Sequence, residues 1–349
     1  MANISRRSTL TIIASGGAAL ATGRARAADP IVSRAIYPVA TAVYQTHFVA
    51  DRVGYFKEAG LDCKLIQGGS GVKTREIVAS QQGDVGIGDI THPMQLSNRG
   101  RGGRVLMPVD TRSSAVIFII RKDLHDQGIN TLEKFAAWKR PDDRKPIVAV
   151  SSLGGTNHVW ASYYMEVMGF DTKVTWIGAG NVDTMLGSLK TKQVDVLVSG
   201  ISLLKDSEEH GWGTTLFDGT NGAIWDKHIG GKVPVTAQFT LQATIDKDPP
   251  KMQALVTALW RAAQWIKTHS PDEICDMIEP YVGSTSRNSN LLEIIDLKKV
   301  ADYDGTIDAA AWARGEKVWF REMTGIKPLT PADLVAPTFL EVAKKAYPA

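Results

Sequence analysis

The segment "GLDCKLIQGGSGVKTREIVASQQGDVGIGD", residues 60–89, contains the order of elements that decides the fold. Apolar residues alternate in its first part, between a Gly-Leu-Asp turn and a run of glycines, which is typical of a β-strand. The pattern around Val72–Gln81 then predicts a helix, and "GDVGIGD" predicts a short strand that ends at Asp89. Strands that alternate with helices indicate parallel β-sheets covered by helices on both faces.

The same order of elements recurs later in the chain. Residues 169–200, "GFDTKVTWIGAGNVDTMLGSLKTKQVDVLVSG", again give turn, strand, turn, helix and short strand. A strand and a helix precede each copy: Arg34–Pro38 with a helix over 44–59, and Ile147–Val150 with a helix over 157–168. The repetition predicts two α/β lobes of similar plan.

Two β-rich runs flank the second copy and indicate how the lobes are joined. "AVIFII" leaves the first lobe and "VPVTAQFTLQATI" returns to it, which predicts a two-strand hinge. Pro249 and Pro250 then open a long helix, and we expect the helical C-terminal part to pack on the first lobe. The expected division is residues 28–114 and 246–349 in lobe 1, residues 121–232 in lobe 2, and crossings at 115–120 and 233–245.

The N-terminus has the pattern of an export signal. Arg6 and Arg7 precede an uncharged apolar stretch from Leu10 to Gly23, and an Ala-Arg-Ala site follows at residues 25–27. We expect a signal peptide over residues 1–27, cleaved after about Ala27, and a periplasmic protein. The arginine pair resembles the twin-arginine type; because Thr9 replaces the usual Phe, the general secretory route stays open.

Charge and cysteine content exclude some classes of protein. The formal net charge is +3, and the four arginines of the leader account for more than all of it. The rest of the chain, roughly 320 residues and enough for about two domains, is close to neutral, which does not suit a nucleic-acid-binding protein. Cys63 and Cys275 are too few for a disulfide scaffold; they are either two buried thiols or one disulfide.

Several stretches together resemble a known family. "VADRVGYFKEAGLDCKLIQGG", "GDVGIGD", "GGTNHVWASYYMEVMGFD" and "MLGSLKTKQVDVLVSG" are similar to the nitrate/sulfonate/taurine-type periplasmic solute-binding proteins of ABC importers, within the superfamily that also binds pyrimidine precursors. The resemblance covers the chain after the leader. It implies the two-lobed periplasmic-binding-protein fold (type II), with a ligand held between the lobes by loops at the carboxyl ends of strands.

Four loops that follow strands and precede helices are expected to line the site. "SLGGTN" at 152–157 supplies the second-lobe side, because two glycines and a helix start can present free backbone N–H groups to an anion. Arg112 is the one strong cation expected near the mouth, and it suits a carboxylate or sulfonate. The residues expected to contact the ligand are Tyr44, Gln45, Thr46, Ser70, Asp89, Thr91, Arg112, Gly155, Thr156, Asn157 and Ser199.

Each of these assignments has a structural alternative. A hydroxyl or amide at a helix start is often only an N-cap, and Arg112 could form a salt bridge. Tyr44 and Trp160 could stack on a planar ligand or belong to the core. His47, His92 and His158 fall near helix starts, but they lack the local spacing of metal ligands, so we expect hydrogen-bonding or packing roles and no metal.

The function expected from these observations is binding rather than catalysis. We expect a monomer that captures a small organic anion and delivers it to an ABC permease and its ATPase at the inner membrane, with no cofactor and no nucleic-acid partner. An enzyme on the same fold is the first alternative, although the chain has no cleft cysteine, no Gly-x-Ser-x-Gly elbow and no phosphate loop. A ligand sensor is the second alternative.

Overall fold

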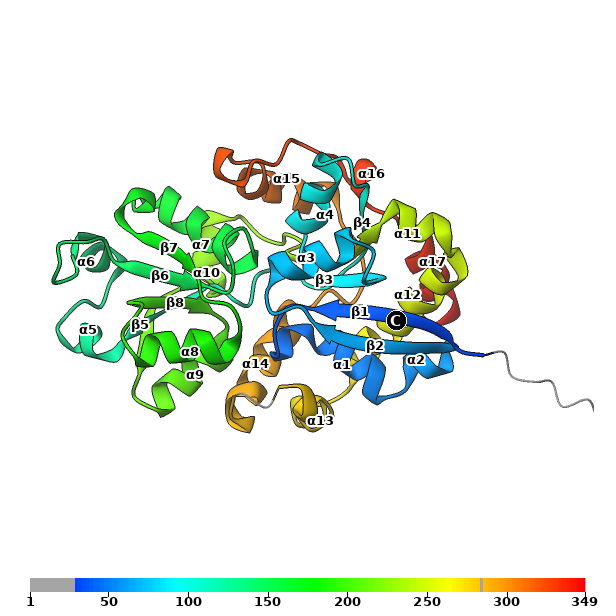
Figure 1. Cartoon of the computed structure of the whole chain (residues 1–349), viewed down its shortest axis with the longest axis horizontal. Coiled ribbons are helices and arrows are strands. Elements are labelled where there is room, and N and C mark those ends of the chain that lie inside the picture. The colour runs from blue at the N-terminus through cyan, green and yellow to red at the C-terminus, as the bar shows by residue number, and fades with distance from the viewer. Residues whose placement is uncertain (1–28, 283–284, 349) are drawn as a thin grey trace, which may run out of the picture.

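The protein contains two α/β lobes that lie side by side, each built on a five-stranded sheet (Figure 1). The structure is a computed structural model that describes residues 29–282 and 285–348. The expected signal peptide lies outside these described residues. No helix of the described part is long and apolar enough to cross a bilayer.

The first sheet has the strand order β2–β1–β3–β10–β4. β1 pairs in parallel with β2 over its whole length and with β3, whereas β10 runs antiparallel to both β3 and β4. The bounds are β1 Ile31–Tyr37, β2 Leu61–Gln67, β3 Val85–Asp89, β4 Gly103–Pro108 and β10 Thr236–Leu241.

The second sheet, with the order β7–β6–β8–β5–β9, repeats this plan. β6 lies between two parallel partners, and β5 runs antiparallel to β8 and β9. The bounds are β5 Ile117–Arg121, β6 Ile147–Val150, β7 Thr175–Gly178, β8 Val196–Ser199 and β9 Gly213–Asp218. The repetition expected from residues 60–89 and 169–200 is confirmed, because β2–β1–β3 and β7–β6–β8 have the same order and direction.

The two sheets are mixed and not parallel throughout, whereas the alternation of strands and helices indicated parallel sheets. In each sheet the fourth strand comes from the other half of the chain: β5 follows the first-lobe strands in sequence, and β10 follows the second-lobe strands. Each of these strands enters its sheet from the side of the other lobe. It therefore runs opposite to its neighbour in the βαβ unit, and both sheets are mixed.

The connections between the sheets begin earlier in the chain than the expected crossings. β5 and β10 are themselves sheet strands, so the chain passes between the sheets at residues 109–116 and 229–235. The crossings expected at 115–120 and 233–245 therefore mostly describe strands inside the lobes. Hinge motion about the connecting segments stays a prediction.

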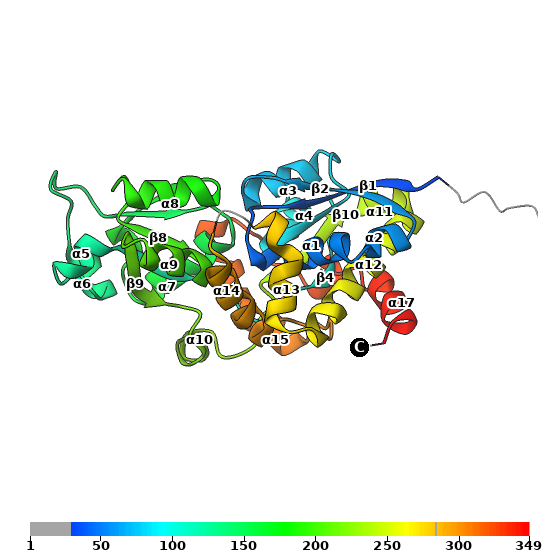
Figure 2. The ribbon, with the colours of Figure 1, turned by 90° about the horizontal axis from the view of Figure 1, so that it is seen from below.

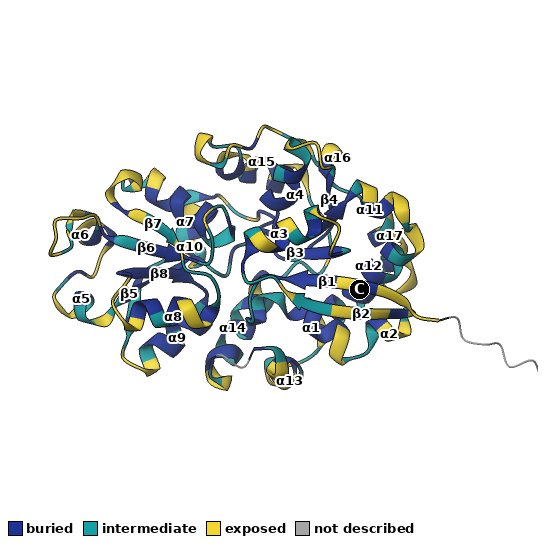
Figure 3. Cartoon of the chain, in the orientation of Figure 1, coloured by how far each residue is buried: buried dark blue, intermediate teal, exposed yellow. Residues whose placement is uncertain are grey.

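Helices cover both faces of the first sheet (Figure 3). The helix expected over 44–59 is interrupted at Gly54, which adopts a left-handed φ of 92° and separates α1 from α2. The helices of this half are η1 Ala42–Tyr44, α1 Gln45–Arg52, α2 Tyr55–Glu58, α3 Gly71–Ala79 and α4 Thr91–Asn98.

The second lobe has helices on both faces of its sheet, shown in green on the left of Figure 1. Its helix α7 begins at Thr156 and carries the fully buried Trp160 and Tyr164. The bounds are α5 Lys122–Asp126, α6 Leu132–Ala137, α7 Thr156–Val167, η2 Asp171–Lys173, α8 Val182–Lys190, α9 Ile201–Glu209 and α10 Gly222–His228.

The C-terminal helices pack on the first lobe and also on the junction between the lobes. α12 contacts α1, α2 and α17 on the first lobe, as expected. α14, however, contacts α9 of the second lobe as well as η1, and α15 contacts α7 (Figures 1 and 2). α14 and α15 therefore lie at the junction between the lobes, and the assignment of residues 246–349 to lobe 1 stays a prediction. The bounds are α11 Gln242–Lys247, α12 Pro249–Thr268, α13 Pro271–Ile278, η3 Glu279–Tyr281, α14 Arg287–Val300, α15 Ala309–Trp319, η4 Glu322–Thr324, α16 Pro331–Leu334 and α17 Thr338–Ala346.

Candidate functional site

A cleft between the two sheets has walls from both lobes, from a connecting segment and from α14. The atom-free space that it encloses, including the part open to solvent, is about 570 Å³. Four residues expected at the ligand site line it: Tyr44, Thr156, Asn157 and Ser199. The other lining residues are Val39, Thr41, Val43, Ser113, Ser114, Ala115, Ser151, Val182, Met185, Gly200, Leu203, Thr236 and Glu293.

The start of α7 forms the second-lobe wall. Gly154 has a left-handed φ of 77°, which turns the chain into the helix after β6. Gly155 is the N-cap, and no side chain caps the first amides of the helix. The Asn157 side chain donates to the Val198 carbonyl at 2.8 Å, which holds the helix start against β8. Backbone N–H groups at an uncapped helix start lack intrahelical partners, so they are available to an acceptor in the cleft.

Glu293 of α14 is a cleft residue that sequence reasoning missed. Its side chain is only 1% exposed, and its Oε2 accepts from the Ala42 backbone N–H at 3.2 Å. Burial raises the pKa of its carboxyl to about 7, although the Ser202 side chain and backbone N–H and the Ala42 N–H act in the opposite direction. Ala42 opens η1 in the first lobe and Ser202 lies in α9 of the second, so this carboxyl joins the two lobes.

The buried Tyr44 hydroxyl lies near several carboxyl groups at the cleft. Burial raises the pKa of its hydroxyl, and the charges of Glu293, Asp89 and Asp110 raise it further. Burial likewise raises the pKa of Asp110 to about 7. Among the described residues, no lysine, arginine or histidine lines the cleft.

Asp89 and Thr91 lie beside the cleft and join the lobes instead of lining it. The Asp89 Oδ1 accepts from the Thr91 backbone N–H at 2.9 Å and from its hydroxyl. The Asp89 Oδ2 accepts from Trp160 Nε1 of the second lobe at 3.2 Å. Burial raises the pKa of Asp89, while these hydrogen bonds, from Thr91 first, oppose the rise. Trp160 stacks on Trp225 with ring centroids 5.0 Å apart, so it belongs to the core rather than to an open stacking surface.

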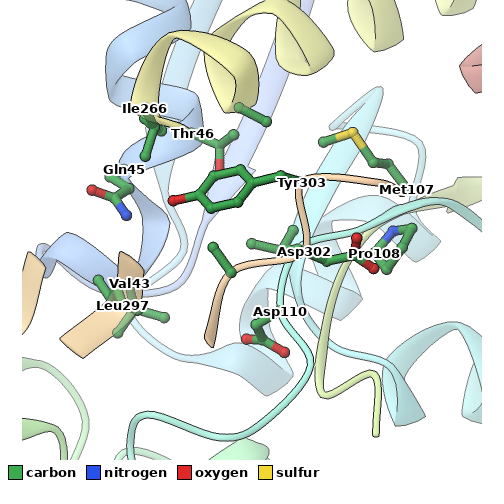
Figure 4. A pocket seen from close by; sticks show the side chains of 13 residues that line it. Val43, Gln45, Thr46, Met107, Pro108, Asp110, Ile266, Leu297, Asp302 and Tyr303 are labelled. Atoms are coloured by element: carbon green, nitrogen blue, oxygen red, sulfur yellow. The ribbon is translucent and has the colours of Figure 1, made fainter. Parts of the chain in front are cut away.

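Gln45 and Thr46 face a different pocket from the one expected. Both line a space under α12 and α14 in the first lobe, together with Tyr303 and Asp110 (Figure 4). They follow Tyr44 at the point where η1 passes into α1, and the turn of the helix carries their side chains away from the cleft. Their sequence position next to Tyr44 gave no sign of this difference.

Ser70 and Arg112 also lie away from the cleft lining. Ser70 caps α3 by accepting from the Lys73 backbone N–H at 3.3 Å. The Arg112 guanidinium lies beside the start of α10, so a Cβ added at Gly222 would lie 3.0 Å from its Nη1. Gly155 is buried at the N-cap of α7, and Gly71 of the first lobe lies next to its Cα. Ligand contact by any of these residues stays a prediction.

The three histidines have buried surroundings. Burial lowers the pKa of His47 to about 4, of His92 to about 3 and of His158 to about 4. His47 Nε2 lies 2.8 Å from Gln238 Oε1, and His158 Nδ1 accepts from the Gly154 N–H at 3.0 Å. Within residues 29–282 and 285–348, no three metal-ligating side chains come together. Cys63 and Cys275 are both free thiols, so the disulfide alternative does not apply.

A protein-family comparison matches most of the chain. The model of the NMT1-like family matches residues 37–279. The chain belongs to the NMT1-like family. The match covers the strands from β2 to β10 and the cleft residues up to Thr236. No curated protein matches this NMT1-like chain in sequence.

Solved structures with the same fold include binding proteins and one enzyme. The periplasmic nitrate-binding protein NrtA of Synechocystis PCC 6803 has a TM-score of 0.66 and 17% identity, over 92% of this chain and 90% of that one. The alkanesulfonate-binding protein SsuA of Xanthomonas axonopodis pv. citri, bound to MOPS, has a TM-score of 0.66 and 12% identity, over 89% of this chain and 100% of that one. The desulfurization enzyme DSZB has a TM-score of 0.60 and 14% identity, over 91% of this chain and 99% of that one.

These matches confirm the expected family resemblance and the two-lobed periplasmic-binding-protein fold. At these identities the structural matches establish the fold alone. Because DSZB shares the fold, fold similarity does not separate binding from catalysis, and the absence of enzymatic activity stays a prediction.

Proposed function

We propose that this NMT1-like protein is the substrate-binding component of an ABC importer, which captures a small organic solute in the cleft and delivers it to a membrane permease. One observation carries the proposal: a single cleft has walls from η1, from the 109–116 connection and from the starts of α7 and α9. A ligand there would contact both lobes only when they are close together, so binding would favour the closed arrangement.

Several further properties belong to the proposal. The leader at residues 1–27 supports a periplasmic location, and family membership supports a permease and an ATPase as partners. Structural neighbours named as nitrate- and alkanesulfonate-binding proteins support a small polar ligand. We also expect the protein to act as a monomer.

The sequence indicated an anionic ligand for two reasons, the helix start at 152–157 and Arg112, and the structure supports the first of them. The uncapped start of α7 suits the anionic or hydrogen-bond-accepting head of a ligand. Arg112, the expected charge partner, is not among the residues that line the cleft. Backbone N–H groups and hydroxyls would therefore bind the head of the ligand.

A thermal-shift screen of the mature protein tests the proposal. The panel holds nitrate, sulfonates, carboxylates, amino acids and pyrimidines, each at high concentration. A true ligand at 100 times its Kd adds about 2.7 kcal/mol to the free energy of unfolding, which gives a clear rise in Tm. Calorimetry on each hit should give one site per chain. A best ligand that is turned over to product would contradict the binding function and favour an enzyme.

A further inference from the structure

We infer that the ligand carries an N–H donor group that binds the Glu293 carboxylate, opposite an acceptor group that binds the start of α7. Glu293 is then a specificity-determining residue, which selects against plain anions that have no donor. The inference rests on the proposed function, because it concerns the ligand of the same cleft.

The first step is the charge of the cleft lining. Glu293 is the one formally charged side chain among the residues that line the cleft in the described chain. The remaining polar groups of the lining are hydroxyls, the Asn157 amide and backbone groups. A ligand that reaches Glu293 therefore meets an acceptor without a neighbouring cation to neutralise it.

The second step is the acceptor capacity of the carboxylate. A carboxylate offers about four lone-pair positions. The Ala42 backbone N–H and the Ser202 backbone N–H and hydroxyl lie beside the Glu293 carboxyl and fill at most three of them. At least one position is left for a donor from the cleft.

The third step is the space that the chain leaves for this carboxylate. A Cβ added at Gly200 would lie 2.3 Å from Glu293 Oε1, so only glycine allows the carboxylate this close to the start of α9. Gly200 itself lines the cleft. The carboxylate is thus brought to the cleft wall by a close approach that any larger residue at position 200 would prevent.

The fourth step is the electrostatics around Glu293. Besides Glu293, Asp89 and Asp110 lie close enough to Tyr44 to raise the pKa of its hydroxyl. A nitrate or simple sulfonate placed beside Glu293 would be repelled, whereas an amine or amide N–H would form a charge-assisted hydrogen bond. The uncapped amides of α7, on the second-lobe wall, remain available for the acceptor end of the same ligand.

Matched pairs of probes test the inference by calorimetry on the full mature protein. The pairs are aminomethanesulfonate with methanesulfonate, glycine with acetate, and para-aminobenzoate with benzoate, with nitrate added. Each is measured on the wild type, on Glu293→Gln and on Asp296→Asn. The control removes a carboxylate from the same helix at a more exposed position, where Asp296 pairs with Lys299.

We expect the amino member of at least one pair to bind the wild type more tightly than its partner. Glu293→Gln should weaken that binding about tenfold, the difference between a charge-assisted and a neutral hydrogen bond, and Asp296→Asn should leave it unchanged. Equal or tighter binding of the members without an amino group, unaffected by Glu293→Gln, would overturn the inference and leave the proposed function standing.

Mass spectrometry of small molecules released from the denatured, freshly purified protein covers ligands outside the pairs. A released molecule with an N–H donor supports the inference, and one without a donor overturns it. If no probe binds and no molecule is released, the proposed function falls and the inference falls with it.

Discussion

Glu293 is an acid that is buried without a basic partner. Among the described residues it forms no ion pair; its Oε2 accepts from the Ala42 N–H of η1, and Ser202 of α9 lies beside it. An uncompensated buried charge costs free energy, and such costs are often found at functional sites. The stability of the ligand-free protein therefore offers an independent test of the role of Glu293.

We predict that Glu293→Gln stabilises the ligand-free protein at pH 8, on the order of 2 kcal/mol. The pKa of Glu293 rises in the folded state from 4.5 to about 7, so the folded protein binds this proton more tightly than the unfolded chain does. Its contribution to stability is present below pH 4.5 and is lost as the pH rises through about 7. In urea titrations between pH 4 and 8, the free energy of unfolding should fall less with rising pH for Glu293→Gln than for the wild type. The pKa of Asp110 is also raised by burial, so part of the fall in stability with pH should remain in the variant. Identical pH profiles would contradict this prediction.

Single residues of the site could be predicted only where a strand ends and a helix begins. Thr156, Asn157 and Ser199 line the cleft because carboxyl ends of strands meet there, as the repeat indicated. Which pocket the side chains of Gln45 and Thr46 face depended on the direction of a helical turn, and the sequence did not determine that direction. Glu293 did leave a signal: it lies on the buried stripe that also contains Asn290, Ile294 and Leu297, where a carboxylate is out of place.

At the scale of elements, the start of α7 has no side-chain cap, and the start of α9 at Gly200, on the same cleft, has none either. Asn181 caps α8 and Thr131 caps α6 through their side chains, whereas α7 begins at Gly155 without a side-chain cap. A missing cap leaves backbone donors without partners, which a ligand can satisfy.

We predict that Thr156→Ala weakens ligand binding by about 1 kcal/mol, the scale of one hydrogen bond. Because the Thr156 side chain also hydrogen-bonds the buried Asp89, the variant should lose some stability as well. Thr131→Ala is the matched control. It removes the hydrogen bond from the Lys134 backbone N–H to a capping hydroxyl, so it should cost about 1 kcal/mol of stability and leave affinity unchanged. Calorimetry with the best ligand of the screen, together with urea titration, measures both quantities. An affinity loss shared by the two variants would mean that Thr156 acts only through stability.

Local patterns located most elements, but they did not fix how the elements pair. The expected strands at 34–38 and 147–150 correspond to β1 and β6, and the helix expected from Pro249 is α12. Pairing of β10 between β3 and β4 joins residues more than 100 positions apart, and no local periodicity encodes its direction. The expected helix over 44–59 failed at one residue, Gly54, where backbone freedom outweighed the helical pattern.

At the scale of the whole molecule, contacts other than the two connecting segments also join the lobes. The Arg321 guanidinium, just after α15, donates to the Val159 carbonyl at 2.7 Å and pairs with Glu166 at 2.6 Å, both in α7. A few residues on, the Lys327 backbone N–H donates to Asn98 of α4 in the first lobe at 2.6 Å. Because this segment contacts α7 of one lobe and α4 of the other, moving the lobes apart would strain or break these contacts.

The hydrogen bond from Trp160 to Asp89 crosses directly between the lobes, so it should favour the closed arrangement. We predict that Trp160→Phe, which keeps an aromatic ring stacked on Trp225, increases the radius of gyration of the ligand-free protein in small-angle X-ray scattering. It should also weaken ligand binding, because the closed state would be less populated. Tyr164→Phe is the control: its hydroxyl, one turn further along α7, donates to the Gly219 carbonyl at 2.9 Å within the second lobe. If both variants scatter as the wild type does, the Trp160–Asp89 bond does not set the distance between the lobes.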